Sequence, residues 1–231
     1  MIYTVTLNPA LDKTVQIPSF RLGEVNRISA MRTDPGGKGI NVSKVLRELG
    51  EPSVAAAILG GAAGRKIESA LRALGIEGMY LFTGHETRTN LKIVDPTLHT
   101  NTDVNEPGAP ADEAVLSKLL TQLTDRLRPG DLVVLSGKAP AGAPDTLYRD
   151  WILACRAAGA AVYLDAEGEL LRQGVTAGPA LIKPNQAELS GVMGRPLTTE
   201  DETIRAAQEL LAQGVGCVAV TMGAGGALLC W

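Results

Sequence analysis

The stretch Asp34-Pro-Gly-Gly-Lys-Gly-Ile-Asn41 runs directly into a helical pattern and decides how the rest of the chain is interpreted. One face of the predicted helix carries apolar residues at the spacing i, i+3, i+4 and i+7, namely Val42, Val45, Leu46 and Leu49, and Gly50 can end the helix. Glycines ahead of a helix let a ligand approach the backbone, and the first N–H groups of the helix attract an anion. Lys38 adds a positive charge and Asn41 projects from the first turn. The stretch predicts either an anion-binding loop or an ordinary glycine-rich turn, and it does not fit the GxxxxGK[ST] pattern of a P-loop.

Short apolar runs alternate with helical patterns along the chain. Buried strands are predicted at residues 2–7, 53–59, 132–135, 161–164, 180–182 and 217–221, and helices near residues 40–49, 64–74, 112–127, 145–158 and 200–213. This alternation predicts an α/β fold, with a doubly wound, mostly parallel sheet that has helices on both faces. Residues 13–33 and 88–104 are strand-like with no helix between the strands. They predict extra antiparallel strands that form a small β-sheet lid inserted into one domain of residues 1–231, or else an edge hairpin.

The composition narrows the class of function. The 22 basic and 25 acidic residues give a net charge of −3, so no overall attraction to nucleic acid or to an acidic membrane is expected. Three distant cysteines and two histidines argue against a disulfide framework and a histidine-rich metal site. Residues 1–8 have neither the basic region nor the apolar run of a signal peptide, so a cytoplasmic location is expected.

Several polar residues follow predicted strands. Asp12 comes after the first strand, where a carboxylate can accept hydrogen bonds from ligand hydroxyls or stabilise its own turn. In Lys183-Pro-Asn-Gln-Ala-Glu188, Asn185 suits a helix N-cap and Glu188 completes a capping box. The same two residues suit a water-mediated Mg²⁺ site, with Lys183 beside a phosphate. Arg88 suits a phosphate or an ordinary surface position.

The glycines near residue 225 do not form a dinucleotide-binding fingerprint. That fingerprint requires glycine at position 228, where this chain has Leu228, and a helix afterwards. Gly223-Ala-Gly-Gly-Ala227 therefore predicts a hairpin turn, whose backbone donors can still contact a nucleotide. A nicotinamide-binding oxidoreductase is correspondingly disfavoured.

Taken together, these segments resemble the PfkB or ribokinase-like family of carbohydrate kinases. The likeness is carried by residues 6–12, 35–42, 88–90, 103–108, 181–188 and 221–227, which follow the family's order. The Thr6-Leu-Asn-Pro-Ala-Leu-Asp12 opening and the Gly-Gly-Lys-Gly-Ile-Asn loop are similar to the 1-phosphofructokinase and tagatose-6-phosphate kinase branch. The resemblance implies ATP- and Mg²⁺-dependent phosphorylation of a ketose phosphate, with fructose 1-phosphate favoured by Asp103-Val-Asn-Glu-Pro-Gly108. Tagatose 6-phosphate and fructose 6-phosphate are the alternative substrates.

The resemblance also implies a role for each matched residue. Asp12, Gly37 and Asn41 would hold sugar hydroxyls, while Lys38 and Arg88 would bind the phosphate that the substrate already carries. Arg27 would reach that phosphate from the partner in a homodimer formed through the lid. The ATP phosphates and magnesium would be served by Lys183, Asn185 and Glu188, the last two through water. The nucleotide would be lined by Thr221, Gly223 and Gly226.

Two departures from the family pattern bear on these expectations. Relatives commonly carry Ser-Gly-Ser-Leu-Pro where this chain has Ser136-Gly-Lys-Ala-Pro140, so Lys138 is a further candidate for phosphate binding. The family's Gly-Ala-Gly-Asp signature, whose aspartate is the catalytic base, is expected after Trp231. None of the 231 residues is therefore expected to be that base, and the stretch by itself is expected to be nearly inactive. A non-catalytic phosphosugar-binding protein is the alternative if the natural chain ends at Trp231.

Overall fold

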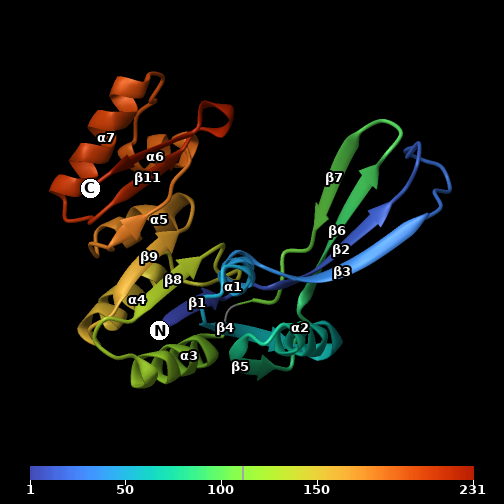
Figure 1. The fold of residues 1–231 in the computed structure, drawn as a ribbon, viewed down its shortest axis with the longest axis horizontal. Helices are drawn as coiled ribbons and strands as arrows, with labels where there is room; N and C mark the ends of the chain where they lie inside the picture. The colour runs from blue at the N-terminus through green and yellow to red at the C-terminus, as the bar shows by residue number, and fades with distance from the viewer. Residues whose placement is uncertain (111) are drawn as a thin grey trace.

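The central element of the structure, a computed structural model that describes residues 1–110 and 112–231, is an eight-stranded sheet (Figure 1). Its strand order is β12-β11-β10-β9-β8-β1-β4-β5, and neighbouring strands run parallel except β11 and β12. The strands are β1 (Ile2–Thr6), β4 (Ser53–Gly60), β5 (Glu77–Thr83), β8 (Leu132–Ser136), β9 (Ala161–Asp165), β10 (Leu181–Ile182), β11 (Val218–Thr221) and β12 (Ala227–Cys230). The predicted mostly parallel sheet is confirmed.

Helices lie on both faces of the sheet around β4, as the alternation of its residues shows. Val54 and Ala56 join the apolar cluster that includes helices α3 and α4, whereas Ala55 and Ala57 join the cluster of α1 and α2. The helices are α1 (Lys38–Glu48), α2 (Gly61–Ala73), α3 (Glu113–Arg126), α4 (Leu147–Ala157), α5 (Gly168–Val175), α6 (Gln186–Met193) and α7 (Glu200–Ala212). The doubly wound class is thereby confirmed, because residues of one strand alternate between two separate cores. Within the described ranges, no helix is both long and apolar enough to cross a bilayer.

Two elements of the core are absent from the sequence prediction. Strand β5 is an edge strand with mixed exposure, so its sequence lacks the continuous apolar run of a buried strand. Helix α5 contains Gly168 and Gly174, which weaken its intrinsic helix preference. Gly174 is nevertheless required, because a Cβ there would lie 2.4 Å from the Leu164 side chain. Tertiary packing therefore determines this helix.

The lid is a second, four-stranded sheet with the order β3-β2-β6-β7, and it projects away from the core (Figure 1). It contains β2 (Ala10–Gln16), β3 (Ala30–Gly36), β6 (Arg88–Asp95) and β7 (Thr100–Asn105). The expectation of purely antiparallel strands is wrong at its centre, because β2 and β6 run parallel. Both strands leave the core at the same end of the lid, and this shared origin gives them the same direction. Val15, Ile17 and Ile93 form a small apolar cluster of their own within the lid.

Candidate functional site

The predicted site residues gather where the carboxyl ends of the parallel strands meet the base of the lid. Strands β1, β8, β9, β10 and β11 lie consecutively in the sheet. The candidate sugar residues come from the base of the lid strands, from the start of α1 and, for Lys138, from the loop after β8, whereas the candidate nucleotide residues follow β10 and β11. Parallel sheets open their ligand crevice at this edge. The topology thus places the two groups of candidate residues next to each other along one edge.

The glycine loop is packed tightly against the end of β1. Gly37 has a φ of 115° and precedes α1, and a Cβ there would lie 2.6 Å from Thr6 Cγ2. The Thr6 hydroxyl accepts a hydrogen bond of 2.9 Å from the N–H of Ile40, in the first turn of the helix. These contacts explain why glycine precedes the helix. They fix Lys38 and Asn41 at the start of α1, at the edge of the crevice.

Asp12 and Asn90 form the polar contact at the base of the lid. They lie opposite each other across β2 and β6, and Asn90 Nδ2 donates a hydrogen bond of 2.9 Å to Asp12 Oδ1. Among the residues that the structure describes, Asn90 Oδ1 is buried and receives no hydrogen bond. Gly36 lies beside Asp12, where a Cβ would approach Asp12 Oδ2 to 2.0 Å. The pair therefore presents a carboxylate and a free carbonyl oxygen, both of which accept hydrogen bonds from hydroxyl groups.

The lid continues this polar character over one of its faces. A cavity of about 580 Å³ is lined by Asp12, Thr14, Arg32, Asp34, Lys44, Asn90, Lys92, Asp103 and Asn105. Arg32 pairs with Asp34 at 3.2 Å and Lys92 with Asp103 at 3.7 Å. Most of these residues were missed as site candidates. The sequence feature that could have identified them is the alternation of polar residues along each lid strand, which predicts that one face of the lid sheet is polar and solvated.

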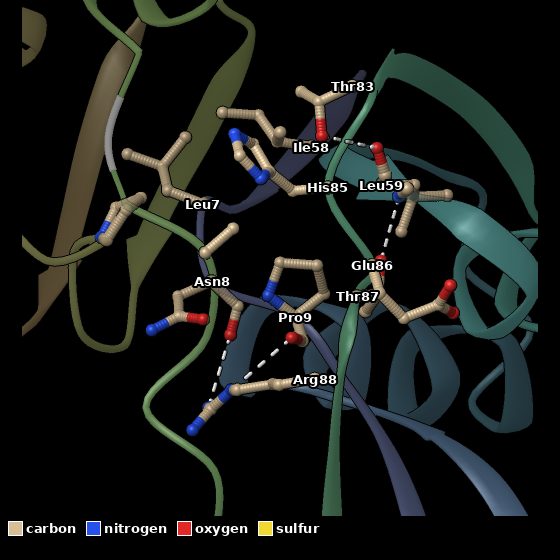
Figure 2. A pocket seen from close by; sticks show the side chains of 13 residues that line it. Leu7, Asn8, Pro9, Ile58, Leu59, Thr83, His85, Glu86, Thr87 and Arg88 are labelled. Atoms are coloured by element: carbon tan, nitrogen blue, oxygen red, sulfur yellow. Dashed lines mark hydrogen bonds between the residues drawn. The ribbon is translucent and has the colours of Figure 1, made fainter.

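Arg88 binds the backbone where the lid joins the core. Its guanidinium donates to the carbonyl oxygens of Pro9 at 3.4 Å and Asn8 at 3.2 Å (Figure 2). It also donates to the carbonyl oxygen of Glu106 at 2.9 Å. Partial burial lowers the pKa of Arg88, while Asp12 and Glu106 act in the opposite direction. The structure thus places Arg88 at the lid base, next to a small cavity of about 40 Å³. These contacts use three of the five N–H groups of the guanidinium, so two remain for a phosphate.

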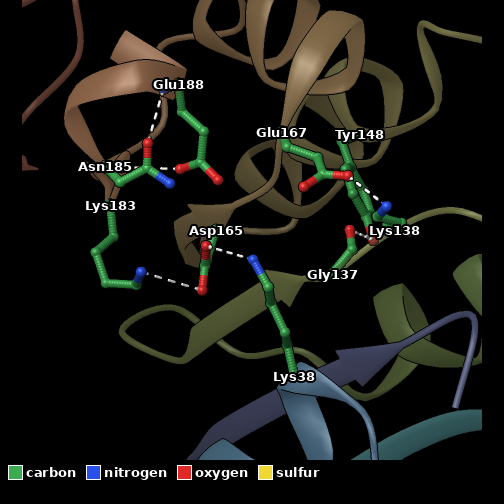
Figure 3. Close-up of polar contacts among 9 residues, drawn as sticks. All are labelled: Lys38, Gly137, Lys138, Tyr148, Asp165, Glu167, Lys183, Asn185 and Glu188. Carbon is green, nitrogen blue, oxygen red and sulfur yellow. Dashed lines mark hydrogen bonds and ion pairs between the residues drawn. The ribbon is translucent and has the colours of Figure 1, made fainter. Parts of the chain in front are cut away.

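A carboxylate between the two subsites was not predicted. Asp165, at the end of β9, lies 3.2 Å from Lys38 Nζ through Oδ1 and 3.4 Å from Lys183 Nζ through Oδ2 (Figure 3). The argument that selected Asp12, a carboxylate at the carboxyl end of a parallel strand, applies equally to Asp165. It was overlooked because no recognisable motif surrounds it. The structure brings Lys38 and Lys183 to one acidic group.

Lys138 forms a separate ion pair. Its Nζ lies 2.9 Å from Glu167 Oε1, and both side chains are substantially exposed (Figure 3). Beneath this pair, the hydroxyl of buried Tyr148 donates to the Gly137 carbonyl at 3.0 Å. Burial, with a smaller contribution from the charge of Asp165, raises the pKa of Tyr148. Tyr148 therefore stays protonated and holds the loop that carries Lys138.

On the nucleotide side, Asn185 and Glu188 form the predicted capping box of α6. Glu188 N donates to Asn185 Oδ1 and Asn185 N donates to Glu188 Oε2, both at 2.8 Å. Thr221 is held alongside by a bond of 3.0 Å from its N–H to the Pro184 carbonyl. Gly223 and Gly226 have φ angles of 57° and 89° in the turn between β11 and β12, which confirms the hairpin.

The residues present fit a divalent cation that is held mainly by phosphate and water. Within the described residues, no three His, Cys, Asp or Glu side chains are grouped closely enough to form a metal cage. Mg²⁺ in phosphoryl-transfer sites typically uses one or two carboxylates together with substrate phosphates. Asp165 and Glu188 supply such carboxylates at this edge of the sheet.

Arg27 is not brought to these residues by its own chain. It is exposed in the segment between β2 and β3, at the end of the lid away from Asp12. The same segment exposes Leu22 and Val25, whose exposed fractions are 90% and 84%. Arg27 therefore lies on a surface with unusually exposed apolar side chains.

Comparison with known proteins agrees with this geometry. The family described as "pfkB family carbohydrate kinase" matches residues 5–230. A 1-phosphofructokinase of Rhodobacter capsulatus is 42% identical over 229 residues, which cover 99% of this chain and 72% of the relative. The 1-phosphofructokinase of Bacillus subtilis is 36% identical, with 99% of this chain and 74% of the relative covered.

Solved structures show the same likeness. Phosphofructokinase-2 from Escherichia coli in complex with fructose-6-phosphate has a TM-score of 0.95 and 32% identity, with 99% of this chain and 76% of that chain covered. A tetrameric inhibited form of the same enzyme has a TM-score of 0.94 at the same identity and coverage. The match in sequence and fold extends over nearly the whole chain. The chain therefore belongs to the pfkB family of carbohydrate kinases.

Proposed function

We propose that this protein transfers phosphate from ATP to a hydroxyl of a ketose phosphate, with fructose 1-phosphate as the substrate and fructose 1,6-bisphosphate as the product. The observation that carries the proposal is the placement of Lys38 and Lys183 on either side of Asp165, together with the Asp12–Asn90 pair at the base of the lid. This reaction requires cations that bind the phosphates of both substrates, which Lys38 and Lys183 can supply. It also requires groups that hydrogen-bond to the sugar hydroxyls, which Asp12 and Asn90 can supply. The relatives named 1-phosphofructokinase favour this ketose phosphate over others.

The sugar subsite is proposed to lie between the glycine loop and the lid. Asp12 accepts hydrogen bonds from sugar hydroxyls, Asn41 can accept or donate them, and Gly37 allows close approach of the backbone. Asn90 Oδ1, buried without a donor among the described residues, is suited to a further hydroxyl. Lys38, Arg88 and Lys138 provide cations for the existing phosphate, with Arg27 contributed by a partner subunit. Positioning of the attacking hydroxyl in this way is the larger part of phosphoryl-transfer catalysis.

The nucleotide subsite is proposed at the ends of β10 and β11. Lys183 binds the ATP phosphates, and Thr221, Gly223 and Gly226 line the nucleotide. Magnesium, once bound, neutralises charge on the transferred phosphate, and water molecules connect it to Asn185 and Glu188.

The proposed homodimer is supported by the exposed Leu22, Val25 and Met31 on the lid.

Calorimetric titration tests the proposal directly. Fructose 1-phosphate, fructose 6-phosphate, tagatose 6-phosphate and unphosphorylated fructose are titrated into the wild type and into Lys38→Gln. Fructose 1-phosphate should bind most tightly, and the variant should lose about tenfold to a hundredfold of that affinity, since a charge-assisted hydrogen bond is removed. Fructose should be affected far less. Equal losses for fructose and its phosphate, or tighter binding of another ketose phosphate, would refute the assignment.

A further inference from the structure

One carboxylate serves two lysines that are assigned to different substrates. Each lysine contacts its own oxygen, Lys38 with Oδ1 at 3.2 Å and Lys183 with Oδ2 at 3.4 Å (Figure 3). The pairing of strands β9 and β10 fixes the position of Asp165 relative to Lys183. β9 and β10 are paired so that Leu164 lies opposite Ile182, and therefore Asp165 and Lys183 emerge next to each other.

The surrounding charges leave Asp165 as the counter-ion of both lysines. Lys138 is paired with Glu167, and the carboxylate of Glu188 accepts from the backbone of Asn185. The side chains of Lys38 and Lys183 are 45% and 46% exposed, whereas that of Asp165 is only 19% exposed. Ligand phosphates can therefore reach the lysines, while the carboxylate stays fixed between them.

We infer that Asp165 is a shared counter-ion that couples the sugar-phosphate subsite to the nucleotide subsite. The inference rests on the proposed function, since Lys38 and Lys183 must bind phosphates of different ligands. A phosphate that binds Lys38 repels the Asp165 carboxylate, which then forms an ion pair with Lys183 alone. The phosphate of the second ligand must then displace Asp165 from Lys183, with which Asp165 forms a stronger ion pair than before. In the absence of a divalent cation, each ligand therefore weakens binding of the other by more than the repulsion between the two ligands themselves. Asp165 also competes with each ligand singly.

Removal of the carboxylate should reverse both effects. With a chelator present, fructose 1-phosphate and ATP are titrated separately and then each in the presence of saturating amounts of the other. Asp165→Asn should bind each ligand alone about twofold to fivefold more tightly, as expected for loss of a partly exposed ion-pair competitor. The mutual antagonism should shrink by a similar factor, and it must be the same in both orders of addition, because coupling is reciprocal. Glu209→Gln, which breaks the remote exposed pair with Arg195 on α7, is the matched control and should change neither value.

A double-mutant cycle supplies a second test that does not depend on one variant. Lys183→Gln should lower fructose 1-phosphate affinity in the wild type, because Asp165 then pairs with Lys38 only. In the Asp165→Asn background the same change should have a smaller effect, limited to the loss of one distant charge. Thermal melting confirms that each variant is folded before titration.

The outcomes separate the inference from the proposed function. If the wild type binds both ligands but Asp165→Asn binds them with unchanged or lower affinity, the shared counter-ion is wrong and the proposed function stands. Unchanged antagonism in Asp165→Asn leads to the same conclusion. If the wild type binds neither ligand, the proposed function fails and the inference fails with it.

Discussion

Asn90 and Asp12 lie opposite each other on neighbouring parallel strands of the lid, with Asn90 Nδ2 donating to Asp12 Oδ1 at 2.9 Å. The contact joins two segments that are 78 residues apart in the sequence. It means that the candidate sugar subsite is assembled by the lid as well as by the core. Substitutions at the base of the lid should therefore change the affinity for the sugar more than they change the packing of the core.

Gly36→Ala is expected to weaken binding of fructose 1-phosphate at least tenfold, because the new Cβ would lie 2.0 Å from Asp12 Oδ2 and displace the carboxylate. The fold should persist, since the clash is with a side chain. Gly84→Ala is the control, as a Cβ there meets nothing within 4 Å. Calorimetry on both variants measures the effect, and equal affinities would place Asp12 outside the sugar subsite.

Glu86→Ala is expected to destabilise the protein by about 1 kcal/mol, because a carboxylate that caps a helix is removed. Glu86 accepts hydrogen bonds from the N–H groups of Ala62 at 3.1 Å and Ala63 at 2.6 Å, in the first turn of α2. Thermal melting measures the loss. Glu68→Ala, which breaks an exposed pair with Arg72 on the same helix, should cost less than about 0.5 kcal/mol.

A second effect of Glu86 concerns the lid. Glu86 lies two residues before β6, which carries both Arg88 and Asn90. Loss of the contact with α2 should loosen the start of this strand and increase hydrogen exchange there relative to α7. If Glu86→Ala exchanges like the wild type throughout β6, the contact acts on α2 alone.

The lid should lose stability in acid through Asp95. Burial raises the pKa of Asp95, but hydrogen bonds from the N–H groups of Leu98, Phe20, Ser19 and Thr97 lower it by more, and the net pKa lies below its ordinary value. A lowered pKa in the folded state stabilises the protein above the pKa of the unfolded chain, about 4. That contribution is lost as pH falls through the folded-state value.

Asp95→Asn isolates this effect. The variant should be less stable than the wild type near neutral pH, and the difference should shrink as pH falls below about 4. Melting curves across that range measure it. A difference that stays constant down to the lowest pH would show that the charge of Asp95 is not the stabilising feature.

The lid surface is expected to mediate self-association. Val25→Asp places a charge on a side chain that is 84% exposed, next to Leu22 at 90%. If lids pair in a homodimer, light scattering should show a shift towards monomer for this variant. Leu49→Asp, on a side chain 72% exposed at the end of α1, should leave the mass unchanged. A wild type that is monomeric at all concentrations would refute the pairing and remove Arg27 from the shared site.

Local patterns in the sequence were sufficient for much of the fold. The i, i+3, i+4 spacing after Asn41 predicted α1, and Asn185 with Glu188 predicted the capping box that begins α6. Gly50, with a φ of 83°, follows the end of α1 as predicted. These features depend on residues within a turn or two of each other, and so they can be inferred without knowledge of the rest of the chain.

Contacts between distant segments could not be inferred in this way. Strand β5 and helix α5 have weak local signals and form because neighbouring elements bury them. The parallel pairing of β2 with β6 depends on where both strands leave the core. The carbonyl contacts of Arg88 depend on two segments, one after β1 and one after β7, that converge on the start of β6.

The sequence by itself determined the α/β class, the glycine loop and the family. Each of these can be inferred from short segments, because the order and spacing of the segments are visible along the chain. The tertiary structure decided which charges meet. Asp165 shares no segment with Lys38, from which it is separated by 127 positions, and no periodicity links the two. The strand order, which sets β9 between β10 and β8, and the packing of α1 against β1 and β8 together place this carboxylate between the two lysines. Electrostatic pairing depends on distance in space, and that distance is fixed by sheet topology rather than by sequence separation.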